Sequence, residues 1–308
     1  MKKRDYLKIR DLSKLEYIAL FRRAAELKAA RKLHRLVKTM QGRTLVMLFE
    51  KNSTRTRLSF EAAMLQLGGT VIDLSSSNSQ LSRGEPLADT ARVASRYCDV
   101  MMMRTFGDAR IEEFALHSTV PVINGLTDGG HPVQIITDLF TIEEKLGSVE
   151  GKTLAFIGDT ASNMGRSFCE AAAWFGFKLR LGSPTGYHPA KDVLDLSPGF
   201  VTCVSSPQEA VKGADVVITD VWTSMGQEAE SAKRLKDLNG FQVDAALMKQ
   251  ANAKSIFLHC LPAHRGEEVS AEVIDGPQSA AWDEAENRMH VQKALLEYVV
   301  DETEKLKA

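Results

Sequence analysis

The chain has 308 residues, of which 44% are hydrophobic and 26% charged, values typical of a soluble globular protein with room for two domains. The formal net charge of −1 excludes a broad basic surface for nonspecific nucleic-acid or membrane binding, so an anion site would have to be local. We expect no signal peptide and no membrane span. The four cysteines lack C-x-x-C spacing, which favours a reduced, cytoplasmic chain without a zinc ribbon or redox dithiol.

The first half of the chain alternates between strand and helix signals. A long helix is expected over 15–40, because its apolar residues have helical spacing and it contains few helix breakers. Short apolar runs after it predict strands at 44–50, 70–75, 99–105 and 120–126. Each strand is followed by a predicted helix, at 54–67, 86–98, 108–118 and 132–147. Near-continuous apolar strands between helices are typical of a parallel sheet that is covered on both faces.

The same alternation restarts near residue 150. Strands are expected at 153–159, 178–183, 200–206, 215–222 and 255–261, and helices at 163–176 and 279–300. We therefore predict an α/β fold with two doubly wound parallel-sheet domains, linked by long helices, and a C-terminal helix that packs back on the first domain. The predicted domains are 1–135 with 279–308, then 150–278, with an interdomain helix at 136–149.

The most specific local signal is the run Ser53-Thr54-Arg55-Thr56-Arg57, between an expected strand and an expected helix. Ser53 and Thr54 suit a helix N-cap, and a helix N-terminus offers N–H groups and a positive dipole end to phosphate. Arg55 and Arg57 add forked donors that bind phosphate bidentately. Because ligands of open α/β sheets bind at the carboxyl ends of strands, we predict an anion site here. The alternative is a capped helix with solvated arginines.

Two further strand ends in the first half carry polar side chains. Arg104 ends the strand at 99–105 and is either a second donor for the same anion or a surface arginine. His131 and Gln134 open the helix at 132–147, with Pro132 in a position that suits the first helical turn. An imidazole and an amide one turn apart can face one ligand, such as a carbonyl group. A lone histidine is more often structural, but this position at a strand end favours function.

The second half has polar residues at corresponding positions. The turn at 156–167 lacks the G-x-G-x-x-G spacing of a dinucleotide site. Asp159 and Asn163 in it either recognise a small polar ligand or provide turn and cap chemistry. Asp220, followed by Ser224 and Met225, ends another strand, where a carboxylate would pair with a cationic amine or cap a turn.

Cys260 lies beside His259 at the end of the last expected strand. Three roles remain open for its thiol: a nucleophile, a ligand contact or a zinc ligand. No second cysteine or regular histidine spacing supports zinc. Arg288 on the final helix, taken alone, indicates only a solvated charge.

The motifs STRTR, HPVQ, DVWTSMG and HCLPAHRG occur in the order and at the spacing that transcarbamoylases have, and the resemblance covers residues 1 to about 300. The first two motifs are shared across transcarbamoylases. SMG after the aspartate, together with HCLP, is specific to the ornithine branch. The sequence therefore resembles the ornithine carbamoyltransferases of the aspartate/ornithine transcarbamoylase family.

This resemblance implies two substrate sites and no metal or cofactor. The implied carbamoyl-phosphate contacts are Ser53, Thr54, Arg55, Thr56, Gln80, Arg104, His131, Gln134, Cys260, Leu261 and Arg288. The implied ornithine contacts are Asn163, Asp220, Ser224 and Met225, and the implied catalytic residues are Arg55, Arg104, His131, Asp220 and Cys260. Gln80 matches a residue that reaches a neighbouring subunit, which implies a homotrimer and leaves larger assemblies of trimers open. The family also has a cis bond before the proline that matches Pro262.

The implied reaction is attack of the ornithine δ-amine on carbamoyl phosphate, through a tetrahedral intermediate, to give citrulline and phosphate in arginine biosynthesis or the reverse in catabolism. The two domains are expected to close on the ligands and exclude water. The nearest alternative is a transcarbamoylase for another amine, such as acetylornithine or putrescine. A nicotinamide oxidoreductase is disfavoured by the turn at 156–167, and a non-catalytic phosphate-binding homologue by the intact motifs.

Overall fold

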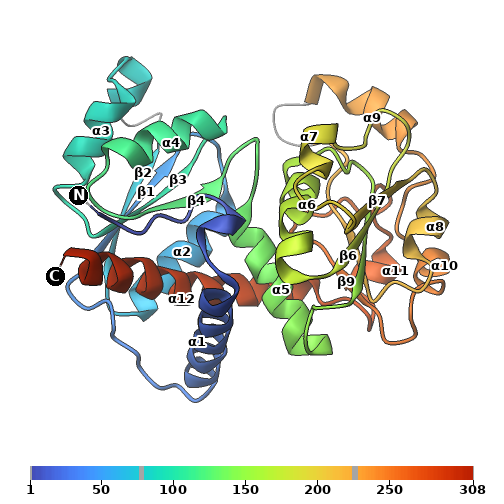
Figure 1. Cartoon of the computed structure of the whole chain (residues 1–308), viewed down its shortest axis with the longest axis horizontal. Helices are drawn as coiled ribbons and strands as arrows, with labels where there is room; N and C mark the ends of the chain where they lie inside the picture. Colours follow the sequence, from blue (N-terminus) through green and yellow to red (C-terminus); the bar gives the residue numbers. More distant parts are fainter. Residues whose placement is uncertain (1, 76–79, 224–227, 308) are drawn as a thin grey trace. The chain divides into compact units, whose positions relative to one another are not determined.

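The structure, a computed structural model, describes residues 2–75, 80–223 and 228–307. The chain divides into two compact units (Figure 1). Unit 1 comprises Met1–Ile136 and Asn287–Ala308, and unit 2 comprises Thr137–Glu286. Helices α5 (Pro132–Leu146) and α12 (Ala281–Lys307) each run from one unit into the other. In the part of the chain that the structure describes, no helix is both long and apolar enough to cross a membrane.

Unit 1 is built on a four-stranded parallel sheet with the order β2-β1-β3-β4. The strands are β1 (Thr44–Phe49), β2 (Thr70–Ser75), β3 (Val100–Arg104) and β4 (Val122–Leu126). The two central strands are buried almost throughout, whereas β2 at the edge is largely open to solvent. Strand order reverses between β1 and β3, so the crevice at their carboxyl ends is where ligands of such sheets bind.

The helices of unit 1 follow the strands as the sequence predicts. They are α1 (Lys14–Lys32), α2 (Thr54–Gln66), α3 (Leu87–Ala94) and α4 (Asp108–His117), with 3₁₀ turns η1 (Ile9–Asp11) and η3 (Gln80–Arg83). The helix expected over 15–40 was predicted too long. It ends at Lys32 because His34 takes a left-handed φ of 53° and the N–H of Arg35 bonds back to the carbonyl of Ala30, a Schellman-type end without a glycine.

Unit 2 contains a five-stranded parallel sheet with the order β7-β6-β5-β8-β9. Its strands are β5 (Thr153–Ile157), β6 (Lys178–Gly182), β7 (Val201–Val204), β8 (Val216–Thr219) and β9 (Ile256–Leu258). Its helices are α6 (Asn163–Phe175), α7 (Lys191–Leu194), α8 (Pro207–Val211), α9 (Ser231–Asp237), α10 (Ala245–Met248) and α11 (Ala271–Ile274), with the 3₁₀ turn η4 (Glu228–Glu230). The strand order reverses between β5 and β8.

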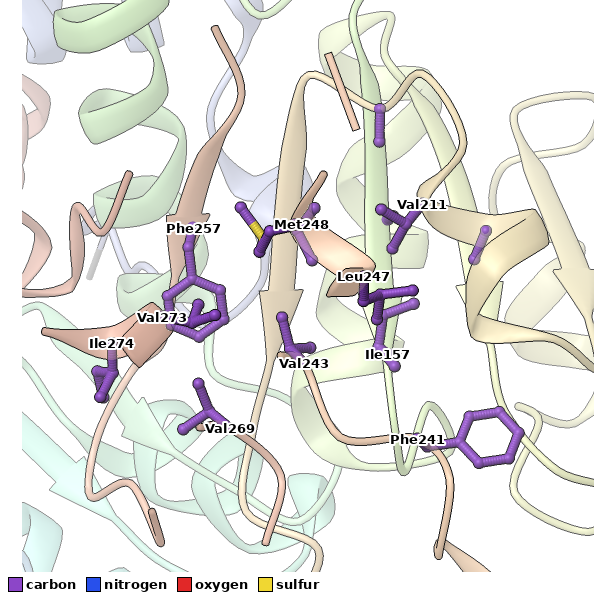
Figure 2. Close-up of a cluster of buried hydrophobic side chains, with 14 of the residues drawn as sticks. Ile157, Val211, Phe241, Val243, Leu247, Met248, Phe257, Val269, Val273 and Ile274 are labelled. Atoms are coloured by element: carbon purple, nitrogen blue, oxygen red, sulfur yellow. The ribbon is translucent and has the colours of Figure 1, made fainter. Parts of the chain in front are cut away.

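The core of unit 2 fixes its last strand against the helices around it. Figure 2 shows Phe257 of β9 beside Val273 and Ile274 of α11, with Leu247 and Met248 of α10 in the same cluster. All five side chains are buried. Burying an aliphatic or aromatic side chain of this size contributes about 1.5–3 kcal/mol, so this packing holds the end of β9 where its polar loop begins.

The C-terminal helix α12 packs back on unit 1 from Asn287 onward, which confirms the predicted fold class. It extends to Lys307, beyond the expected end at residue 300. Its partners in α1 include Arg23, which donates to Glu297, and Lys28, whose buried ammonium donates to Asn287 across 2.7 Å. The helix thereby carries its own polar side chains into the interior of unit 1.

Candidate active site

The N-terminus of α2 lies at the carboxyl end of β1, beside the end of β3. Ser53 is the N-cap, in extended conformation, and its Oγ accepts a hydrogen bond from the N–H of Thr56 across 3.2 Å. Phe49 and Arg104 are register partners at the ends of the two strands, so β3 delivers its arginine to the same turn. The remaining N–H groups of a first helical turn have no partner within the helix and suit an anion.

Two buried arginines meet at the hydroxyl of Thr56. Arg288 Nη2 donates to Thr56 Oγ1 across 2.9 Å, and Arg104 Nη1 donates to the same oxygen across 3.4 Å. Arg288 Nη1 also donates to Gln134 Oε1 across 2.6 Å. These four side chains are 1–6% exposed. The interpretation of Arg288 as a solvated helix charge is therefore wrong, because α12 brings it into the interior of unit 1.

His131 is buried within this positive cluster. Desolvation, and then the charges of Arg288, Arg104 and Arg55, hold the pKa of its imidazole well below the usual value. The ring is therefore neutral at physiological pH and can act as a hydrogen-bond donor or acceptor without adding a further positive charge.

Arg55 and Arg57 of the STRTR run have different surroundings. Arg57 pairs with Asp73 on β2 and stacks on the ring of Phe49, with 4.5 Å from its guanidinium carbon to the ring centroid. This pairing occupies part of the Arg57 guanidinium, and binding of the anion by Arg57 stays a prediction. Arg55 is half-buried, and its Nε has no hydrogen-bond partner within the described part of the chain. A buried N–H without a partner is costly, which makes Arg55 a donor suited to a ligand.

In unit 2, Asp220 and Cys260 lie together at the carboxyl ends of β8 and β9. The Cys260 thiol donates to Asp220 Oδ1 across 3.2 Å, and the same oxygen accepts from the N–H of Val221 across 2.8 Å. Desolvation, and then the charges of Asp220, Glu284 and Asp138, raise the pKa of the Cys260 thiol well above its usual value. The thiol is therefore a protonated donor at neutral pH, which disfavours the nucleophile hypothesis.

The loop after Cys260 is held by the buried pair of His259 and Glu268, which was not predicted from the sequence. His259 Nδ1 accepts from the N–H of Leu261 across 2.9 Å, and its Nε2 donates to Glu268 Oε1 across 3.2 Å. Both ring nitrogens are thus engaged, which disfavours His259 as a partner for Cys260 in a zinc site. Leu261 has a left-handed φ of 60°, and the Leu261–Pro262 bond is cis, as the family resemblance implies. The sequence carried no signal for this role of Glu268, which lies just beyond the HCLPAHRG motif.

The turn after β5 contains Asp159 and Asn163. Asp159 is buried and accepts from Arg234 Nη1 across 2.6 Å and from the N–H of Ala161 across 3.1 Å. Asp159 is therefore engaged in turn and ion-pair chemistry, which favours that alternative over direct ligand recognition. Asn163 is the first residue of α6 and is half-buried beside the N-cap Ser162. No signal in the sequence identified Arg234 as the partner of Asp159.

The remaining predicted ligand contacts are Thr54, Gln80, Ser224 and Met225. Thr54 is the exposed first residue of α2. Gln80 begins η3, and the structure describes its backbone but not its side chain. Ser224 and Met225 lie outside the described residues.

Taken separately, the two units offer complementary chemistry. Unit 1 gathers guanidinium groups and a neutral imidazole at a helix N-terminus, which suits a phosphate joined to a polar carbonyl group. Unit 2 offers a carboxylate hydrogen-bonded to a protonated thiol, which suits a cationic amine.

Comparison with known proteins matches both units to one family. Residues 4–144 match the carbamoyl-phosphate-binding domain of aspartate/ornithine carbamoyltransferases, and residues 150–299 match the Asp/Orn-binding domain. The chain is 53% identical to an ornithine carbamoyltransferase of Chromobacterium violaceum, covering 96% of this chain and 97% of that relative. It is 52% identical to an anabolic ornithine carbamoyltransferase of Pseudomonas aeruginosa, covering 98% of each.

Solved structures agree with the sequence relatives. An ornithine carbamoyltransferase from Pyrococcus furiosus has a TM-score of 0.91 at 44% identity and covers 97% of each chain. One from Burkholderia thailandensis has a TM-score of 0.89 at 47% identity, covering 96% of this chain and 98% of that one. The resemblance found in the sequence is thus confirmed, and the chain belongs to the aspartate/ornithine carbamoyltransferase family of transferases.

Proposed function

We propose that this enzyme transfers the carbamoyl group of carbamoyl phosphate to the δ-amine of L-ornithine, giving L-citrulline and phosphate. The observation that carries the proposal is the cluster of Arg55, Arg104 and Arg288 around Thr56 and the neutral His131. Support for ornithine comes from relatives of about this length that are named ornithine carbamoyltransferases and are 52–53% identical.

In this proposal unit 1 binds carbamoyl phosphate. Ser53, Thr54, Arg55 and Thr56 receive the phosphate at the N-terminus of α2, where N–H groups and guanidinium groups neutralise its charge. The phosphate gains negative charge as it leaves, so the same donors stabilise the departing group more strongly than the bound substrate. The buried Nε of Arg55, which lacks a protein partner among the described residues, supports a direct contact with this anion.

The carbonyl oxygen of the carbamoyl group develops negative charge in the tetrahedral intermediate. We assign its stabilisation to Arg104 and His131, with Gln134 and Arg288 in support. A neutral imidazole can fill this role because one of its ring nitrogens carries an N–H that donates to the developing oxyanion. Removing one such donor typically costs a factor of about 100–1,000 in turnover. Cys260 and Leu261 are proposed as further contacts of the carbamoyl group.

Unit 2 is proposed to bind ornithine through Asn163, Asp220, Ser224 and Met225. The Asp220 carboxylate attracts a substrate ammonium, and the protonated Cys260 thiol orients that carboxylate through the 3.2 Å hydrogen bond. The reaction requires the uncharged δ-amine to meet the carbonyl carbon held by unit 1. Carbon–nitrogen bond formation and loss of the amine proton then precede cleavage of the bond to phosphate. No step needs a covalent enzyme intermediate.

The second candidate is transfer to another amine, such as acetylornithine or putrescine. Asp220 bears on this choice, because an acylated α-amine carries no positive charge for a carboxylate to bind. A citrulline colour assay with carbamoyl phosphate, supported by mass spectrometry of the products, separates the candidates. Ornithine should be used at least about 100-fold better than acetylornithine, succinylornithine, putrescine, lysine or aspartate, a ratio typical of sites that pair with a specific polar group. Preference for another amine would leave the carbamoyl-phosphate site unchanged and would show that the Asp220 loop does not select ornithine.

We also propose that the chain works as a cytoplasmic homotrimer, with Gln80 contacting carbamoyl phosphate in a neighbouring subunit, and that it acts in arginine biosynthesis. The relative in Pseudomonas aeruginosa named anabolic supports this direction. The four cysteines, all free thiols, suit a reducing compartment. Mixing inactive Gln80→Ala and Arg55→Ala chains tests the shared site, because trimers with both chains should regain one intact site. No recovered activity in verified mixed trimers would contradict sharing.

A further inference from the structure

The turn that follows the Cys260 loop gathers three metal-ligating side chains. His264 Nδ1 lies 3.6 Å from Glu267 Oε2 and 3.9 Å from Glu268 Oε2. One ligand atom from each residue lies within 4.8 Å of the other two. An imidazole nitrogen with two carboxylate oxygens is a ligand set that zinc accepts in proteins. The two carboxylates also favour a divalent cation by their charge.

Glu268 supplies an independent observation. Its side chain is fully buried, and Oε1 is occupied by His259 Nε2 and by the N–H of His264. Its Oε2 has no hydrogen-bond partner within residues 2–75, 80–223 and 228–307 and is aimed at the His264 ring. A buried carboxylate oxygen without a donor carries a large desolvation cost, which a bound cation would remove.

The backbone of the turn is also held by contacts outside these three side chains. Gly266 has a φ of 95°, and Arg265 forms a two-point ion pair with Asp275, at 2.8 and 3.0 Å. Gln242 Nε2 holds the carbonyl of Glu267 across 2.9 Å. The ligands therefore project from a rigid support, and His264 and Glu267, with side chains 48% and 39% exposed, remain open to solvent and able to adjust.

We propose that His264, Glu267 and Glu268 bind a divalent cation of the zinc class, with water completing the coordination. Zinc–ligand bonds of about 2.0–2.1 Å place tetrahedral ligand atoms about 3.4 Å apart. The present separations are 3.6 and 3.9 Å from His264 and within 4.8 Å for the third pair, so binding requires the two half-exposed side chains to move toward Glu268. The ion shares Glu268 with His259, so its binding is coupled to the support of the Cys260 loop.

A second group of potential ligands consists of Asp220, His259 and Cys260. Zinc bound to this group must be distinguished from zinc bound at the proposed site. The full-length metal-free protein with Cys260→Ser removes the only sulfur from that group. Zinc is then titrated against a colour-forming chelator. We expect one zinc per chain, and a loss of affinity of at least about tenfold when His264→Ala is added, because a direct ligand is removed.

Glu267→Gln, which keeps size and loses charge, should weaken zinc binding in the same Cys260→Ser background. The matched control is His117→Ala, which removes a half-buried histidine at the end of α4 and should leave zinc affinity unchanged. Circular dichroism of each metal-free variant verifies folding. Cobalt added in place of zinc should give visible absorption bands that His264→Ala removes. Absence of zinc binding in Cys260→Ser, or affinity unaffected by both His264→Ala and Glu267→Gln, would overturn the proposal.

Discussion

Arg288 and Thr56 lie 232 positions apart in the sequence, yet Arg288 Nη2 donates a 2.9 Å hydrogen bond to Thr56 Oγ1. The bond joins the C-terminal helix to the first turn of α2. Because Arg104 donates to the same oxygen, one buried hydroxyl orients two guanidinium groups at the proposed carbamoyl-phosphate site. The position of α12 on unit 1 therefore has a functional consequence in this account.

Thr56→Val tests that relationship. The substitution keeps the shape of the side chain and removes the Thr56 oxygen that accepts from both arginines, so the two guanidinium groups lose a common anchor. We expect kcat/KM for carbamoyl phosphate to fall by at least about tenfold, the equivalent of one hydrogen bond to a charged group. Thr56→Ser keeps the hydroxyl and should retain most of the activity. Equal activity of the valine and serine variants would show that the hydroxyl does not orient the arginines.

Arg55→Ala tests the phosphate contact, and the neighbouring Arg57→Ala provides a matched control. Loss of a charge contact in the transition state should lower kcat/KM by a factor of at least about 100 in Arg55→Ala. Arg57 is paired with Asp73 instead, so its loss should change kcat/KM less than about threefold and stability by at most about 1 kcal/mol. A folded Arg55→Ala enzyme with near-normal turnover would contradict the assignment.

The lowered pKa of His131 should make the stability of the folded chain depend on pH. Burial and three arginines lower the pKa of His131 in the folded chain, whereas the unfolded chain keeps a value of about 6.5. Below about pH 6.5, His131 is therefore protonated in the unfolded state but stays neutral in the folded state. The free energy of unfolding consequently decreases as the pH falls. The neutral His131 gives its full contribution to stability above pH 6.5. Below pH 6.5, the free energy of unfolding falls with a slope that approaches about 1.4 kcal/mol per pH unit.

Denaturant unfolding of wild type and His131→Gln between pH 5 and pH 7.5 measures this effect. The variant should lose less stability than wild type as the pH falls, because its side chain binds no proton in either state. Parallel curves for the two proteins would mean that His131 does not keep a lowered pKa in the folded chain.

Cys260→Ser separates the two proposed substrate sites. A serine hydroxyl is smaller than the thiol and binds the Asp220 carboxylate more closely, which changes the group that receives the ornithine ammonium. We expect KM for ornithine to rise about tenfold, while the affinity for carbamoyl phosphate, measured by calorimetry, changes less. Equal weakening of both substrates would contradict a selective role of Cys260 in binding ornithine.

The sequence predicted those parts of the fold and site that depend on local pattern. Strand β2 was predicted with its observed bounds, and the turn at Ser53 was recognised because cap and phosphate chemistry lie within a few residues. The end of α1 was missed because His34 adopts a left-handed conformation where the usual signal would be a glycine.

Contacts between residues far apart in the sequence could not be predicted from local patterns. Arg57 looked equivalent to Arg55 until the edge strand brought Asp73 beside it, and Arg288 looked solvated until α12 packed back on unit 1. Glu268 carried no periodic or motif signal that would reveal its bond to His259. The family resemblance identified Arg288, whereas the residues alone did not.

Carbamoyl transfer is tested most directly by measuring citrulline and phosphate together, from the purified wild-type chain supplied with carbamoyl phosphate and L-ornithine. We expect both products to form in equal amounts, only when both substrates are present, and Arg55→Ala to lower both in parallel. Phosphate release without citrulline, or citrulline formation that Arg55→Ala leaves unchanged, would contradict carbamoyl transfer at the site described.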